Sequence, residues 1–168
     1  MFRMNRFPLR ICIVLLCTSG ATAYAQNSIS VSSIEPHAIE LAPQYGNSNP
    51  KEATAEYLQW LNYTTLTDSD DPAFSITVQL RQSNLPWRMN LKIKADPYQG
   101  FSKGTEGSSA GVIAVLQGAR TLVDDITTCY SGAGRGQGHC ITFFFSIPDY
   151  TKVSNAGQSV DIVYTLTQ

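Results

Sequence analysis

Short segments in which apolar and polar residues alternate constrain the fold of this chain more than any other feature. Residues 74–81 read FSITVQLR and residues 88–94 read RMNLKIK, so one set of alternate positions is apolar and the other polar. Successive side chains of a strand point to opposite faces of its sheet, whereas a helix repeats about every 3.6 residues. The pattern therefore predicts half-buried strands of an antiparallel sheet.

Other segments rich in β-branched and aromatic residues extend this pattern. We expect strands at 28–34, 37–42, 57–66, 112–116, 121–127, 141–147 and 159–167. The run Asn49-Pro50-Lys51-Glu52 is typical of a helix start, and it predicts at most one helical turn, through Ala55 or further, before the strand at 57–66. Many short strands separated by turn formers favour an all-β, antiparallel β-sandwich of the immunoglobulin or pilin type.

The amino-terminal segment has the three parts of a secretory signal. Residues 1–10 contain three arginines and no acid, residues 11–17 are apolar, and Ala23-Tyr24-Ala25 places small residues three positions and one position before a cleavage site. Seven apolar residues are too few to span a bilayer, which takes about 20. We expect a signal peptide at 1–25, a single domain at 26–168, and a protein exported to the periplasm, the cell surface or the medium.

Charge limits the partners of the exported domain. The chain has 12 basic and 13 acidic residues, and removal of the three arginines of the signal leaves 9 − 13 = −4. Binding of nucleic acid needs clustered Lys and Arg to displace counterions, and none are found here. We expect no nucleic acid, no transmembrane segment and no cofactor. The partners that stay open are the protein itself, another surface protein or a glycan.

Two cysteines are left after removal of the signal, Cys129 and Cys140. In an oxidising compartment they allow one intramolecular pairing, and we predict a disulfide between them. On the chain-entropy model, closing so short a loop stabilises a fold by about 3 kcal/mol.

One serine motif invites comparison with hydrolases. Residues 107–111 read GSSAG and fit G-x-S-x-G around Ser109, with Asp124 or Asp125 and then His139 later in the chain. A nucleophilic serine of this kind needs a strand before it and a helix after it. Here the expected strand 112–116 follows, so we interpret the segment as a Gly/Ser-rich hairpin loop and expect no catalysis.

Metal ligands are sparse. His37 and His139 are the only histidines of the chain, and the acidic run at 68–71 lacks the glycine and the distal glutamate of a calcium-binding EF-hand. We interpret that run as a solvated turn before Pro72 and expect no metal.

A glycine-rich segment and several aromatic residues are the candidates for recognition. Residues 132–138 read GAGRGQG, which is no dinucleotide fingerprint because it opens no helix. It is either a flexible or tightly curved tip held by the expected disulfide, or a recognition loop with Arg135, Gln137 and His139 as polar contacts. Trp87 follows Pro86 at the start of an expected strand, where its ring could lie exposed and stack on a sugar.

Three consecutive phenylalanines, residues 143–145, place aromatic side chains on both faces of the strand expected at 141–147. They predict either that this strand is central or that one of its faces meets a partner.

Three segments carry a resemblance to known proteins: 58–64 (LQWLNYT), the stretch from Cys129 to His139, and the closing 163–167 (VYTLT). Together they resemble uncharacterised secreted β-sandwich proteins of Gram-negative bacteria, over most of residues 55–168. The resemblance implies a fold and no activity. The run 157–163 is also similar to the last strand of spore-coat-U and pilin-type domains. It departs from usher-assembled pilins, whose penultimate tyrosine is replaced here by Thr167.

Taken together, the residues predict an exported structural or interaction module. A carbohydrate-binding module that uses exposed aromatic residues is one alternative, and a pilin-like assembly subunit is another.

Overall fold

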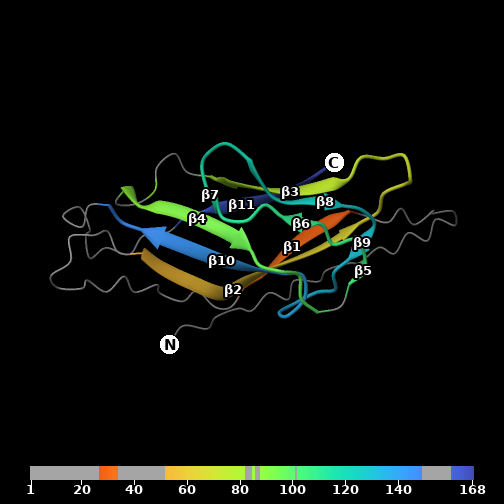
Figure 1. The fold of residues 1–168 in the computed structure, drawn as a ribbon, viewed down its shortest axis with the longest axis horizontal. Helices are drawn as coiled ribbons and strands as arrows, with labels where there is room; N and C mark the ends of the chain where they lie inside the picture. Colours follow the sequence, from red (N-terminus) through yellow and green to blue (C-terminus); the bar gives the residue numbers. More distant parts are fainter. Residues whose placement is uncertain (1–26, 34–51, 82–84, 86–87, 101, 149–159) are drawn as a thin grey trace, which may run out of the picture.

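Two antiparallel sheets make up the fold (Figure 1). The computed structural model describes residues 27–33, 52–81, 85, 88–100, 102–148 and 160–168, with backbone alone for Ser33 and Glu52–Leu58. The larger sheet contains β1 (Ser28–Ser33), β2 (Glu52–Thr65), β4 (Asn90–Ala95), β5 (Lys103–Gly104), β7 (Ile113–Ala114), β9 (Cys129–Tyr130) and β10 (His139–Ser146). The smaller sheet contains β3 (Phe74–Leu80), β6 (Ser108–Ser109), β8 (Arg120–Ile126) and β11 (Ile162–Thr167).

The all-β fold expected from the alternating pattern is confirmed. In β3 every second residue is buried, and in β4 Leu91, Ile93 and Ala95 are buried. The helical turn expected to reach Ala55 is wrong, because β2 already begins at Glu52 and runs for 14 residues. The signal peptide, the strand expected at 37–42, the start of that turn and Trp87 lie outside the described residues.

A single cluster of apolar side chains fills the space between the two sheets. The larger sheet contributes Leu61, Ile93 and Ile141, and the smaller sheet contributes Ile76 and Val123, all with none of their surface exposed. Burial of such side chains contributes about 1.5–3 kcal/mol each, so this cluster is the main source of stability.

β10 is a central strand, which is the first of the two alternatives that the three phenylalanines left open. It pairs with β2 on one edge and with β4 on the other. Phe143 is buried in the core, and Phe145 packs beside it with the ring centroids 6.1 Å apart. Phe144 lies on the opposite face and is half-buried.

The two lateral sides of the sandwich differ. On one side the backbone joins the sheets, because Val115 N–H donates to Leu91 of β4 and Leu80 N–H of β3 donates to Leu116. On the other side lie β1, at an edge of the larger sheet, and β11, at an edge of the smaller sheet. These two strands touch, but no strand pairing joins them in the described part of the chain. We call this second side the open side.

Candidate interaction surfaces

The glycine-rich segment is an insertion in one strand ladder. β9 and β10 pair with the same strand, β2: Tyr130 lies opposite Thr64, and His139 lies opposite Leu61. Residues 131–138 therefore loop out, because only two residues of β2, Asn62 and Tyr63, lie between these paired positions. We call this segment the glycine loop. Its four glycines all have positive φ, between 76° and 91°.

Asn62 holds the glycine loop. This side chain is 2% exposed, and its Nδ2 donates to the carbonyl oxygens of Gly134, at 3.1 Å, and Gln137, at 2.7 Å. Its Oδ1 accepts from the Gly134 N–H, at 3.1 Å, and from the Ser32 hydroxyl of β1, at 2.8 Å. One amide thus satisfies three backbone groups of a loop that pairs with no strand over most of its length. Sequence reasoning missed this role; the only signal was a polar residue within the aromatic stretch of β2.

The predicted disulfide is absent: Cys129 and Cys140 are both buried, and no disulfide joins them. Cys129 lies opposite Thr65 and Cys140 lies opposite Trp60, five positions apart on β2. At about 3.4 Å per residue that offset is about 17 Å, and an odd offset turns the two side chains to opposite faces of the sheet. A disulfide needs Cα atoms within about 7 Å. The glycine loop separates the two cysteines. Hydrogen bonds from Asn62, and not a disulfide, hold this loop.

The structure divides the predicted recognition residues. Arg135 is exposed at the tip of the glycine loop and Gln137 is half-buried. His139 does not share the exposed position of Arg135, because His139 is 2% exposed and begins β10. Its Nδ1 donates to the carbonyl oxygen of Asp96 at 2.8 Å, since a carbonyl can only accept. Trp87 cannot be placed with them, because it lies outside the described residues.

Next to the glycine loop lies a cluster of Tyr63, Tyr98, His139 and the thiol of Cys129, in which Tyr98 is half-buried and the other three are buried. The His139 ring stacks on Tyr63, with centroids 6.1 Å apart, and meets Tyr98 edge-on at 5.4 Å. The hydroxyl of Tyr63 donates to the carbonyl oxygen of Glu106. Burial holds the pKa of Tyr63 far above its ordinary value, and burial also raises the pKa of Cys129. A thiol kept protonated in this way is a poor nucleophile.

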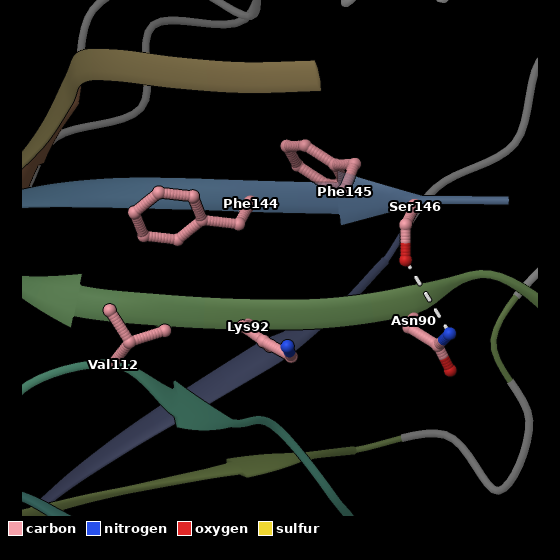
Figure 2. A pocket seen from close by; sticks show the side chains of 6 residues that line it. All are labelled: Asn90, Lys92, Val112, Phe144, Phe145 and Ser146. Atoms are coloured by element: carbon pink, nitrogen blue, oxygen red, sulfur yellow. Dashed lines mark hydrogen bonds between the residues drawn. The ribbon is translucent and has the colours of Figure 1, made fainter. Parts of the chain in front are cut away.

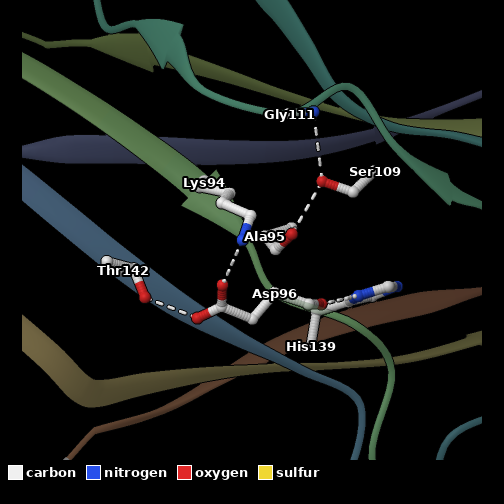
Figure 3. Close-up of polar contacts among 7 residues, drawn as sticks. All are labelled: Lys94, Ala95, Asp96, Ser109, Gly111, His139 and Thr142. Carbon is white, nitrogen blue, oxygen red and sulfur yellow. Dashed lines mark hydrogen bonds and ion pairs between the residues drawn. The ribbon is translucent and has the colours of Figure 1, made fainter.

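Ser109 is held by structural contacts. It belongs to β6, its Oγ donates to the carbonyl oxygen of Ala95 at 2.7 Å, and it accepts from the Gly111 N–H at 3.2 Å (Figure 3). The His139 ring does not bond Ser109; it bonds the carbonyl oxygen of Asp96, the residue after Ala95. No helix follows the motif, because β7 begins at Ile113. The serine is therefore a tie between β6 and the end of β4.

The acidic run forms the solvated turn expected for it. Asp68, Asp70 and Asp71 are exposed, and Asp71 N–H donates to the Asp68 carbonyl at 3.2 Å. Within the described residues, no three His, Cys, Asp or Glu side chains converge to hold a metal ion.

A shallow pocket of about 100 Å³ opens on the face of β4 and β10 that points away from the core (Figure 2). Phe144 and Val112 supply its apolar wall, and Val112 is 53% exposed. Asn90, Lys92 and Ser146 supply polar groups, with Asn90 Nδ2 donating to Ser146 Oγ at 3.4 Å. An aromatic ring beside an amide, an ammonium and a hydroxyl can bind a small polar ligand that has one apolar face.

The second candidate surface is the edge of β11 that points away from β3; we call it the free edge, because no strand among the described residues pairs with it. Its six residues pair with β3 in unbroken register, from Ile162 opposite Leu80 to Thr167 opposite Ser75. The inward-facing side chains Ile162, Tyr164 and Leu166 pack on the core but are only half-buried. The strand contains no charge, no proline and no bulge. Charges, proline and bulges are among the features that protect sheet edges from pairing with another chain.

Comparisons with known proteins add no relative: no family model, curated protein or solved structure matches the chain. In the part of the chain that the structure describes, no helix has the length and apolar character to cross a membrane.

Proposed function

We propose that the protein is an exported interaction module that binds a partner strand at the free edge of β11 and carries out no catalysis. The export follows from the signal expected at 1–25. One observation supports the mode of contact: an uncharged, regular edge strand lies on the open side of the sandwich, with its inward apolar side chains half-buried. An extended segment added to such an edge gains main-chain hydrogen bonds and apolar cover together.

The backbone of β11 offers a definite set of groups to that partner. Arg81 N–H donates to the Asp161 carbonyl at 3.0 Å, so Asp161 points its backbone groups at β3. In an antiparallel pair such residues alternate with residues whose N–H and C=O point away. The residues that point away are therefore Ile162, Tyr164 and Leu166.

A peptide with the sequence of residues 160–168, labelled with a fluorophore, tests the edge directly. We expect its anisotropy to rise on titration with dilute wild-type protein. Ile162→Pro removes one outward N–H at the first position of the strand, where proline is tolerated, and should weaken binding at least tenfold. Thr77→Lys, on the solvent face of the central strand β3, is the matched control and should bind like wild type. No binding to wild-type protein would refute strand addition.

A second candidate function, saccharide binding, is favoured by the pocket around Phe144. A half-exposed ring stacks on the apolar face of a sugar, while Asn90, Lys92 and Ser146 supply hydrogen bonds. A glycan array probed with the protein should give hits that Phe144→Ala removes and Tyr130→Ala, at an exposed aromatic residue of β9, leaves in place. An array without hits would count against this function.

The pilin-like alternative has less support. β1, the strand that such a subunit would donate, pairs with β2 of its own chain from Ser28 to Ser33.

A further inference from the structure

We infer that the strand bound at the β11 edge is β11 of a second copy of this chain, in an antiparallel two-fold pairing centred on Tyr164. This inference rests on the proposed function, because it needs the same edge to accept a strand. It adds the identity of the partner, the register and the symmetry.

The absence of charge makes a second copy an acceptable partner. Two identical edges that carry lysine or glutamate repel each other, which is one of the ways in which edges avoid self-pairing. β11 reads IVYTLT and has nothing to repel its own copy. A two-fold axis is also the simplest closed symmetry, since each subunit contributes the same surface.

The direction of the backbone groups fixes the register. The residues that point to the free edge are Ile162, Tyr164 and Leu166, and a strand pair exchanges bonds between residues of this kind. With the axis at Tyr164, Ile162 lies opposite Leu166 of the second copy, and Tyr164 lies opposite its own equivalent. All outward groups of both strands are then paired. The match also keeps inward side chains opposite inward ones, so the small sheet continues across the axis with one core face.

The pairing covers apolar surface that the isolated chain leaves open. Ile162, Tyr164 and Leu166 are half-buried, and Val31 of the neighbouring β1 is 40% exposed. Each of the three gains a same-face neighbour from the second copy at about 5 Å, the usual spacing of cross-strand partners.

Cysteine pairs test this register. Val163 and Thr165 lie on the solvent face of β11, and the Tyr164-centred pairing places each opposite the other in the second copy, with Cα atoms about 4.5 Å apart. Purified Val163→Cys protein mixed with purified Thr165→Cys protein should give a disulfide-linked dimer under mild oxidation. Either protein alone should give at most one-tenth as much, because its cysteines lie diagonally, about 7–8 Å apart. Wild type, whose two thiols are buried, is the background control.

Charge reversal at the same positions tests the dimer without cysteines. Val163→Lys with Thr165→Lys puts like charges opposite each other, and sedimentation should show a monomer. Val163→Lys with Thr165→Glu puts opposite charges there, and the dimer should persist. Both double variants leave the core untouched.

The outcomes separate this inference from the proposed function. A wild-type protein that stays monomeric at about 100 μM yet binds the 160–168 peptide would overturn the second copy and keep the edge as a binding site for another strand. Cross-linking of Thr165→Cys protein by itself would overturn the register. A monomer that binds no peptide would overturn both.

Discussion

Asn62 illustrates how one side chain can set the shape of a surface. It is buried in β2, and each of its polar groups contacts another part of the chain: two carbonyls and one N–H of the glycine loop, and Ser32 of β1. A loop with four glycines would otherwise be costly to order, because glycine loses more backbone entropy on folding than other residues. The exposed Arg135 is therefore presented from a fixed base.

Replacing this amide tests the role. Asn62→Ala should lower the free energy of unfolding by about 3 kcal/mol, since it leaves several buried backbone groups unsatisfied at roughly 1–3 kcal/mol each. Asn62→Asp keeps the acceptor but puts a carboxylate oxygen against the carbonyl oxygens of Gly134 and Gln137, so it should lower the free energy of unfolding at least as much as Asn62→Ala does. Urea unfolding followed by tryptophan fluorescence measures all three proteins. A loss below about 0.5 kcal/mol for the alanine variant would contradict the clamp.

Gly138 provides a second test at the scale of one residue. Its φ is +81°, and a Cβ there would run into the carbonyl oxygen of Leu61 on β2. Gly138→Ala should therefore destabilise the fold by more than about 3 kcal/mol, because backbone strain and overlap add. Gly134→Ala is the control: φ is +91° but nothing lies within 4 Å of the added methyl group. It should cost only about 1–2 kcal/mol. Equal losses in thermal melts would refute the close approach.

Among the elements, β6 shows how a motif can mislead. Gly-x-Ser-x-Gly fits the sequence around Ser109, but the serine bonds Ala95 and so joins the edge of the smaller sheet to β4. The strand that follows it was predictable from the apolar run after Gly111, and this strand was already the reason to expect no nucleophile there.

Ser109→Ala should therefore change stability and leave hydrolysis untouched. We expect a loss of about 1 kcal/mol, the usual net value of one hydrogen bond. Esterase turnover with p-nitrophenyl acetate should stay at the same background in both proteins. A variant that removed measurable wild-type turnover would show the serine to be catalytic.

The cluster of Tyr63, Tyr98, His139 and Cys129 makes the fold sensitive to alkali. Burial raises the pKa of the Cys129 thiol above its ordinary value of 9.0 and that of Tyr63 above 10.0. The folded chain thus holds these protons more tightly than the unfolded chain does. Their contribution to stability is complete below pH 9 and is lost as pH rises above it. Urea midpoints should be level from pH 7 to 8.5 and fall from pH 9 to 11, with a smaller fall in Cys129→Ser. A flat profile in wild type would contradict this.

Sequence patterns predicted elements much better than they predicted the candidate sites. Alternation identified β3 and β4 because it reports which face is buried, a local property of the chain. The clamp formed by Asn62 depends on a strand and a loop about 70 residues apart, and no local pattern encodes that meeting. The disulfide failed for the same reason: spacing along the chain between Cys129 and Cys140 says nothing of the looped-out residues that separate them in the sheet.

At the scale of the whole molecule, two closures of the sandwich contrast. Backbone hydrogen bonds of Val115 and Leu116 link β4 to β3 on one side, whereas in the described residues β1 and β11 touch on the other side without strand pairing. The proposed partner strand and the proposed dimer both bind on the open side, at the edge of β11.

The maturation of the whole chain is open to a single mass measurement. Protein purified after export should begin at Gln26, and alkylation in denaturant without reductant should label both Cys129 and Cys140. Labelling again after reduction should add nothing. A chain that keeps residues 1–25 would refute the cleavage, and thiols that appear only after reduction would show that the two cysteines are oxidised.

The interruption between β9 and β10 has a consequence for how such a protein can vary. Pairing with β2 resumes at His139, after the glycine loop. Asn62 hydrogen-bonds Gly134 and Gln137, which lie on either side of the tip. Residues inserted between Arg135 and Gly136 would leave both anchor points and every strand register in place. The tip can therefore be lengthened, or a foreign peptide inserted into it, without a change in the strand pairing or in the contacts of Asn62.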